Sequence, residues 1–360
     1  MILFSFGIFY TSGFIHKQRR TLKMYSELEY RNKVTMLSWI LAVGVVFRHG
    51  VNIIGYSLSG GLLWFERFIG HATDVIVPLF FIISGYLFFQ NYDERYLLLK
   101  GKSRLYSVAI PYLIWNVIAY LYYQVIALFP EVSDSLSRKV EPLSAIWIVK
   151  NALFGFHNIT WFLRYLILYH FSFSALFPLL KNKIICIIFV CICFFISIHS
   201  GVEEAFQNVF RYATFYGIGA YLGIFERDIV KRRSCRKTRG ACLIIAVTMI
   251  IIEMAFSFPA FVYIPYRYAQ CILVWIISDE IPVDVEPKWY MKNSFLIYCM
   301  HSIILESIQK VTYILFDHNS IVALIDSIAS PAATIIIISI FTFYFRKNRK
   351  IYCILAGGRT

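Results

Sequence analysis

The amino-acid sequence predicts an all-α protein, a polytopic membrane bundle of about ten transmembrane helices with both termini in the cytoplasm. Hydrophobic residues make up 59% of the chain, charged residues only 16%, and the mean hydropathy is +0.65, outside the range of soluble domains. Apolar segments recur along the whole chain, and basic residues gather between alternate segments. The predicted spans are residues 34–53, 72–90, 105–129, 161–180, 184–199, 208–225, 240–258, 267–281, 294–316 and 321–345.

The net charge of +14 follows this topology. If the first span runs outward from the cytoplasm, most Lys and Arg residues lie in the inner segments, above all in 17–33, 95–104, 227–239 and 346–359. By the positive-inside rule, both termini are then cytoplasmic. The signal is weakest for the short eighth span and for residues 144–156. Because the charge is explained by membrane orientation, we expect no nucleic-acid partner.

A single membrane domain is expected at residues 34–345, which hold all ten spans with short loops between them. Residues 1–33 form a cytoplasmic N-terminal lead, and residues 346–360 form a cytoplasmic tail. The apolar start of the chain is too short to span a bilayer comfortably, and no basic residues precede it as in a signal peptide. Either this start is an interfacial segment, or translation begins at Met24 and residues 1–23 are absent from the native product.

The second span contains the string VPLFFIISGYLFF at residues 77–89. Pro78 leaves a backbone carbonyl that a neighbouring helix or water must pair, and the small residues Ser84 and Gly85 allow another helix to approach closely. Such a helix is typical of a packed bundle and not of a lone anchor. The string resembles the second span of the acyltransferase family 3 membrane enzymes, which typically reads VPLFFxxSGY.

Ionisable residues inside spans are costly, so each is a candidate functional residue. His49 lies near the outer end of the first span, where a neutral imidazole can act as a general base for water or a hydroxyl. A histidine that only makes an interhelical hydrogen bond is the alternative that the residues leave open. In acyltransferase family 3 a first-span histidine is held to be catalytic, and the resemblance places His49 at that position.

One position departs from the family pattern. The family usually has a basic residue eleven positions before this histidine, about three helical turns away on the same face, and here that position is Ser38. Arg48, which points about 100° away from His49 around the helix, and Lys33, more than a turn closer to the cytoplasm than Ser38, could each substitute. What replaces the missing charge remains open.

Lys100 and Arg104 precede the third span and lie four residues apart, so they share a helix face at its cytoplasmic end. The string PYLIW at residues 111–115 follows them and resembles the Pro-Tyr-x-x-Trp start of this span in the family. The resemblance implies that both residues meet the phosphates of coenzyme A. An ordinary positive-inside cluster is the alternative. The family often has a second arginine one turn later, where Ser107 stands here.

Two further strings resemble family signatures. WFLRYL at residues 161–166 opens the fourth span, where Arg164 can orient an acceptor sugar or a lipid-carrier phosphate and Trp161 can stack on the sugar. An interfacial Trp/Arg anchor is the alternative. In the ninth span, Tyr298 and His301 match a Phe-x-x-Tyr-x-x-His pattern and are neighbours on one helix face. They either line the substrate channel or form a buried pair that bonds across helices.

Three carboxylates also fall within spans, Glu253, Glu306 and Asp326. Any of them could orient the first-span histidine and set its tautomer, and ion pairing with Arg211 or Lys310 is the alternative. The eight cysteines show no CxxC spacing. We interpret them as apolar packing residues and expect no metal site.

The resemblance covers residues 34 to 316 in four separate blocks. It implies a transferase, an integral membrane O-acyltransferase that moves an acyl group, most often acetyl, from acyl-CoA to a sugar hydroxyl of a surface polysaccharide or its lipid-linked precursor. Acyl-CoA, acetyl-CoA in the usual case, is then a co-substrate and no cofactor stays bound. The expected partners are acyl-CoA, a glycan or lipid-linked sugar acceptor, and membrane lipid, and the expected location is the inner (plasma) membrane of a bacterium.

Two other functional classes compete with this interpretation. A transporter or flippase of a lipid-linked sugar also needs polar residues inside a bundle, but such proteins commonly show internal repeats with paired broken helices, which we do not find. A glycan polymerase or ligase is expected to use a large outer loop, whereas the longest outer stretch, residues 130–160, is modest and partly apolar.

Overall fold

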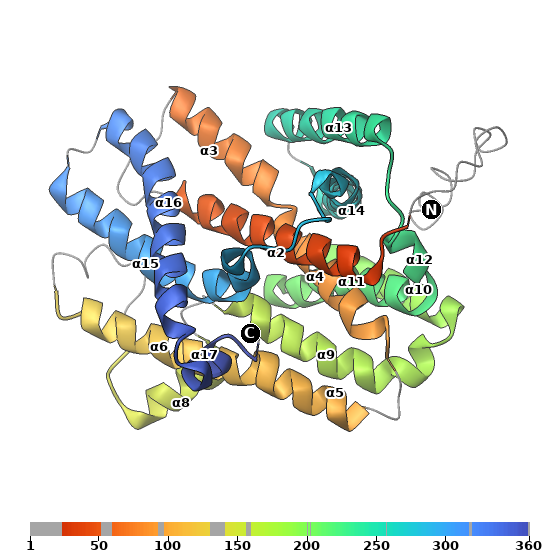
Figure 1. Cartoon of the computed structure of the whole chain (residues 1–360), viewed down its shortest axis with the longest axis horizontal. Coiled ribbons are helices and arrows are strands. Elements are labelled where there is room, and N and C mark those ends of the chain that lie inside the picture. The colour runs from red at the N-terminus through yellow and green to blue at the C-terminus, as the bar shows by residue number, and fades with distance from the viewer. Residues whose placement is uncertain are drawn as a thin grey trace.

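The computed structural model describes residues 24–51, 60–92, 97–129, 141–155, 160–199, 201, 203–256, 258–316 and 319–358. These residues fold into a helical bundle (Figure 1) and contain no strand, only an isolated bridge between Met24 and Arg232. The all-α prediction is therefore confirmed for this part of the chain. The two interpretations of residues 1–23 concern a segment outside it.

Helices occupy each of the ten predicted spans. The longer helices are α2 (Glu27–Gly50), α3 (Gly60–Thr73), α4 (Ile76–Phe89), α6 (Ile110–Ile126), α9 (Trp161–Leu180), α10 (Lys183–Ile198), α11 (Glu204–Phe225), α13 (Arg236–Ala255), α14 (Ala260–Ile277), α15 (Ser294–Leu315) and α16 (Ser320–Phe345). Shorter elements are α5 (Leu97–Arg104), the π-helix η3 (Leu105–Ala109), α8 (Ala145–Phe154), α12 (Arg227–Val230), the 3₁₀ helices η4 (Ser278–Glu280) and η5 (Trp289–Asn293), and α17 (Arg349–Leu355).

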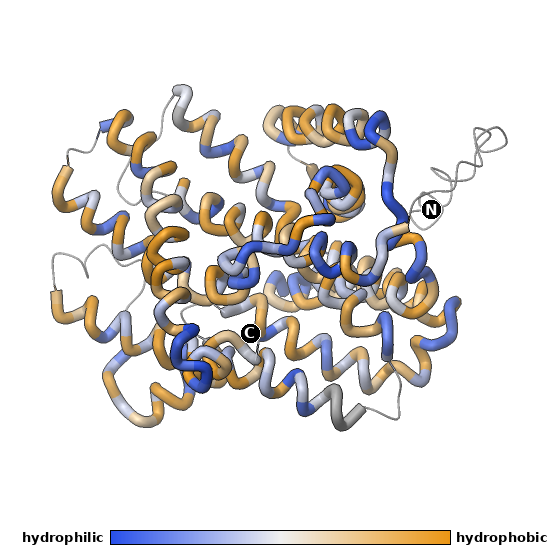
Figure 2. The backbone as a smooth tube through the Cα atoms, viewed as in Figure 1, coloured by the Kyte–Doolittle hydropathy of each residue, from blue (hydrophilic) through white to orange (hydrophobic). Residues whose placement is uncertain are grey.

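Six helical stretches of the described residues are long and apolar enough to cross a bilayer. They are Leu63–Phe89, Gly101–Ile126, Trp161–Leu180, Arg236–Ala255, Ala260–Glu280 and Ser320–Phe345. Apolar side chains also cover their outer faces: Ile244 on α13 is 70% exposed and Ile336 on α16 is 58% exposed, and Figure 2 shows hydrophobic residues along the outer helices. Because exposing such continuous apolar faces to water is unfavourable, the bundle is membrane-embedded.

Helices α4 and α11 pack with their backbones in contact. A Cβ atom added at Gly85 of α4 would lie 2.3 Å from the carbonyl oxygen of Tyr216, and one added at Gly219 of α11 would lie 2.1 Å from that of Ile82. Gly223 repeats the contact one turn later. The predicted close approach at Gly85 is confirmed, and it is completed by a small-xxx-small pair on the partner helix that the sequence analysis did not identify.

Pro78 has a milder effect than the sequence analysis expected. The chain turns at Asp74 and Val75, and α4 begins afresh at Ile76, so Pro78 lies in the first turn of the helix. First-turn N–H groups have no intrahelical acceptor, and proline there removes no hydrogen bond. The proline therefore follows the short turn between α3 and α4, within the longer helical stretch Leu63–Phe89.

The start of α2 is fixed by a buried ion pair. Lys33 is fully buried and pairs with Asp279 of η4, and its ammonium lies 4.0 Å from the ring centroid of Trp275. Asp279 also accepts hydrogen bonds from the Tyr25 hydroxyl (2.8 Å) and from both the backbone N–H and the hydroxyl of Ser234 (2.7 Å each). Burial, reinforced by the bond to Asp279, raises the pKa of Tyr25.

Residues 144–156, which gave a weak signal, form the ten-residue helix α8, too short to cross a bilayer. Its last three carbonyls, at residues 152–154, accept hydrogen bonds from Asn116 (3.1 Å), the Tyr112 hydroxyl (2.9 Å) and Arg164 (2.9 Å). Side chains of α6 and α9 thus supply the donors that the end of a short helix lacks, and α8 is held against these two helices.

Because the backbones of α4 and α11 are in contact, one methyl group added at Gly219 should strongly lower the stability of the protein. Gly219→Ala should destabilise the protein by about 1–3 kcal/mol, because the new Cβ meets backbone atoms that cannot move aside. The unfolding temperature of the purified protein in detergent measures this. Gly240→Ala is the matched control, since nothing lies within 4 Å of a Cβ there, and it should leave stability unchanged or slightly higher. A Gly219→Ala protein as stable as the wild type would contradict the described packing.

Candidate functional site

Two histidines from different helices meet inside the bundle. His49 lies in the last turn of α2, and its ring centroid is 5.2 Å from that of His301 on α15, with an angle of 39° between the ring planes. His301 is 2% exposed, whereas the His49 side chain is exposed. The structure therefore brings together two residues that the sequence analysis selected from opposite ends of the chain.

The buried ring of His301 has a defined orientation. Its Nδ1 lies 2.6 Å from the carbonyl oxygen of Tyr298 and must donate a proton to it. In a neutral ring this leaves Nε2 without a proton, 3.3 Å from the Ser302 hydroxyl. The side chain of His49, in contrast, forms no hydrogen bond with any residue that the structure describes, so these contacts do not support the alternative of an interhelical bonding histidine.

Tyr298 extends the site toward α9. Its ring centroid lies 6.0 Å from that of His301 and 5.6 Å from that of Phe162, which is in the first turn of α9. Its hydroxyl is buried and finds no hydrogen-bond partner among the described residues. A buried polar group without a partner is rare in proteins and often marks a binding position. Tyr298, His301 and His49 thus form one continuous group of side chains.

Trp161 and Arg164, at the start of α9, have contacts that favour the anchor interpretation. The Trp161 ring is partly buried and packs against the rings of Tyr165 and Tyr212, at centroid distances of 5.8 Å and 5.1 Å. Arg164 donates to the last carbonyl of α8, that of Phe154. Both side chains therefore already have protein partners.

Arg104 ends α5, directly before the π-helix η3, and is partly buried. Its guanidinium lies over the Phe88 ring, 5.2 Å from the centroid, and it forms no ion pair with the described residues. An arginine held by an aromatic ring keeps its N–H donors for an anion. Single-turn π-helices are frequent at functional sites, and Ser107 lies on this one. The side chain of Lys100 is outside the described residues.

The structure distinguishes between Lys33 and Arg48, the two candidates to replace the basic residue that is missing at Ser38. Lys33 already forms an ion pair with Asp279. It also lies 16 residues before His49, about 24 Å along α2. The ion pair with Asp279 and this distance argue against Lys33 as the substitute. Arg48 remains, but it points toward the carboxylate of Asp74, at 3.6 Å, and is about one-third exposed.

Sequence reasoning missed a charged cluster beside Arg48. Arg267 of α14 is fully buried and forms ion pairs with Asp74 (2.9 Å) and with Glu253 of α13. His71 at the end of α3 lies 3.2 Å from Glu253. Asp74 and Arg267 both lie within predicted spans, residues 72–90 and 267–281. Their position in apolar sequence was the available signal.

This cluster contains the atoms of a possible metal site, since one ligand atom each of His71, Asp74 and Glu253 lie within 4.8 Å of one another. The guanidinium of Arg267 contacts both carboxylates and already supplies the compensating positive charge. We therefore interpret the cluster as a structural ion-pair network that joins α3, α4, α13 and α14.

The other in-span carboxylates do not orient His49. The Tyr123 hydroxyl donates to Glu306 (3.0 Å), and the Ser330 hydroxyl donates to Asp326. The proposed cationic partners Arg211 and Lys310 form no direct ion pair among the described residues, and the Lys310 ammonium is buried without a hydrogen bond. The neighbour of His49 is thus His301 and not a carboxylate.

A family model described as an acyltransferase domain (Acyl_transf_3) matches residues 33–345, most of the chain. The chain therefore belongs to acyltransferase family 3, as the four strings predicted, and is a membrane-embedded acyltransferase. No curated protein and no solved structure matches it.

The buried ion-pair network predicts that the stability of the fold depends on Arg267. Arg267→Met should lower stability by about 3–5 kcal/mol, because it leaves the buried carboxylate of Glu253 without its arginine partner and removes one of the two arginines that pair with the half-buried Asp74. The yield of monodisperse protein after detergent extraction reports this loss. Arg211→Met is the matched control and should extract like the wild type, since Arg211 forms no ion pair with the described residues. Equal yields for the two variants would refute a structural role for the cluster.

Proposed function

We propose that this acyltransferase is an O-acyltransferase that moves an acetyl group from acetyl-CoA to a sugar hydroxyl of a surface polysaccharide or its lipid-linked precursor. The observation that carries the proposal is the exposed His49, whose side chain makes no hydrogen bond with the described residues and whose ring lies beside the fixed, buried ring of His301. A general base must be free to accept a proton and accessible to the group that loses it. His49 meets both requirements.

In the proposed reaction, Nε2 or Nδ1 of His49 accepts the proton of the acceptor hydroxyl as the oxygen attacks the thioester carbonyl. The new bond joins the sugar oxygen to the acyl carbon, and the carbon–sulfur bond breaks. The coenzyme A thiolate then takes the proton back from the His49 imidazolium. His301 and Tyr298 lie behind the base, where the buried Tyr298 hydroxyl is placed to donate to a polar group of the reacting pair.

Arg104 is the proposed contact for the coenzyme A phosphates. It lies at the end of α5 that the positive-inside rule assigns to the cytoplasm, and it has an aromatic ring beside it but forms no ion pair with a carboxylate of the described residues. Lys100, one turn earlier, is proposed to assist it. The ten-span topology with cytoplasmic termini and the location in a bacterial inner membrane are part of this proposal, because acetyl-CoA is supplied in the cytoplasm.

The acceptor is proposed to reach His49 past the first turn of α9. We infer that Trp161 and Arg164 shape this side of the site through their contacts with Tyr212 and with the end of α8. His301 and Tyr298 are then the residues that contact the sugar. This assignment agrees with the alternative in which Trp161 and Arg164 are anchors.

His49→Gln should reduce acyl transfer by about 10²–10⁴-fold, the usual contribution of a general base. Release of coenzyme A thiol by the purified protein, with acceptor glycan and acetyl-CoA present, measures the rate. His199→Gln is the control, because His199 is exposed at the end of α10 and touches none of the proposed site. Full activity of a folded His49→Gln protein would rule out the mechanism.

Arg104→Gln should raise the KM for acetyl-CoA about tenfold or more and leave kcat nearly unchanged, because a charge-assisted bond to phosphate contributes equally before and during reaction. Steady-state kinetics at varied acetyl-CoA separate the two constants. Lys102→Gln, an exposed basic residue on the same helix, should have little effect. If both variants show wild-type KM values, the phosphates bind elsewhere.

A further inference from the structure

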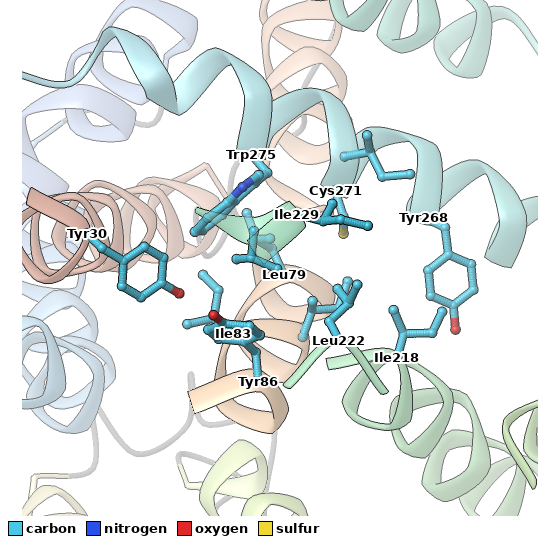
Figure 3. Close-up of a pocket in the computed structure, with 13 residues that line it drawn as sticks. Tyr30, Leu79, Ile83, Tyr86, Ile218, Leu222, Ile229, Tyr268, Cys271 and Trp275 are labelled. Carbon is cyan, nitrogen blue, oxygen red and sulfur yellow. The ribbon is translucent and has the colours of Figure 1, made fainter. Parts of the chain in front are cut away.

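An apolar pocket lies between α4, α11 and α14, away from the paired histidines (Figure 3). Its volume is about 80 Å³, roughly half that of an apolar cavity known to hold benzene (~150 Å³), so it has room for several methylene groups. Tyr30 lines one end of it and stands 19 residues before His49, about 28 Å along α2. The pocket is therefore separate from the proposed reaction centre.

The pocket is elongated along the helices. Its lining residues recur about one turn apart on each helix: Leu79, Ile83 and Tyr86 on α4, and Tyr268, Cys271 and Trp275 on α14. Seven residues of α-helix rise about 10 Å, so the apolar channel runs at least that far parallel to the helix axes. A lipid acyl chain in a bilayer runs in the same direction.

One end of the pocket reaches the surface of the bundle. Ile229 and Val230 of α12 and Ile272 of α14 line it and are only half-buried, whereas Leu79, which lies in the middle of the lining in Figure 3, is 2% exposed. An apolar chain can therefore enter between α12 and α14.

The helix α12 at this open end begins a basic segment of the chain. Residues 226–239, which begin with Glu226 and α12, contain seven Lys and Arg residues but only two acidic residues. Lys231 pairs with Glu27, but Arg227 is exposed and forms no ion pair with the described residues. Its Nε donates to a backbone carbonyl, which leaves its terminal nitrogens for an anion.

We propose that this pocket binds part of one acyl chain of an anionic phospholipid, with the headgroup phosphate on Arg227 and the basic residues that follow. Basic pockets between helices on the cytoplasmic side of membrane proteins are typical sites for anionic headgroups. An empty apolar cavity loses the dispersion contacts that a chain would restore. The pocket is thus a built lipid site that joins α4, α11, α12 and α14.

The test is native mass spectrometry of the full-length purified protein with added phosphatidylglycerol or phosphatidylcholine of identical acyl chains. The wild type should retain one phosphatidylglycerol at concentrations where phosphatidylcholine does not bind. Ile218→Trp and Ile272→Trp, which fill the pocket from α11 and α14, should lose this lipid. Ile244→Trp, on the exposed face of α13, is the matched control and should keep it.

Arg227→Gln tests the headgroup separately and should weaken phosphatidylglycerol binding about fivefold without affecting phosphatidylcholine. Two results would overturn the proposal: equal retention of the two lipids by the wild type, or wild-type retention of phosphatidylglycerol by both filled variants. The unfolding temperature in lipid-free detergent distinguishes lost binding from misfolding. It should be equal to or higher than that of the wild type in the filled variants, because their side chains occupy the cavity.

Discussion

The central constraint on this protein is that a charge inside a membrane bundle must find its partner within the protein. Two charged groups satisfy it at opposite ends of α2. At the start of the helix, Lys33 pairs with Asp279, just after α14. At the other end, Arg48 approaches Asp74, which in turn pairs with Arg267 of α14. Both ends of α2 are thus linked to α14, one to the 3₁₀ helix η4 just after its last residue and the other to Arg267 near its middle.

This double attachment explains why α2 can carry the proposed base. His49 follows Arg48 directly, so the cluster around Arg267 fixes the turn of α2 from which His49 projects. The carbonyl of Gly50 accepts a hydrogen bond from Gln309 of α15 at 2.9 Å, which joins the end of α2 to the helix that carries His301. The His49 side chain itself makes no hydrogen bond with the described residues, and it is the residues next to it, Arg48 and Gly50, that are held in place. Proton transfer requires an accessible base whose neighbours hold it in position.

The sequence predicted the positions of the helices well, because hydrophobic runs and basic loops are local signals. It also selected His49, Tyr298 and His301, although only resemblance to a family linked them, and the structure brings their rings together. The cluster of Asp74, Glu253 and Arg267 was missed because pairing across some 190 residues leaves no local pattern. For the same reason the sequence did not reveal Asp279 as the partner of Lys33. It also did not reveal the turn at Asp74 that places Pro78 in the first turn of α4.

The most direct measurement of the central claim is an experimental structure of the protein in a lipid nanodisc with a non-hydrolysable thioether analogue of acetyl-CoA. The account predicts that the phosphates lie on Arg104 and that the acyl group lies beside His49, with space for one hydroxyl between the imidazole and the acyl carbon, since reacting atoms approach to about 3–3.5 Å. An acyl group bound far from His49, or phosphates bound away from Arg104, would contradict it.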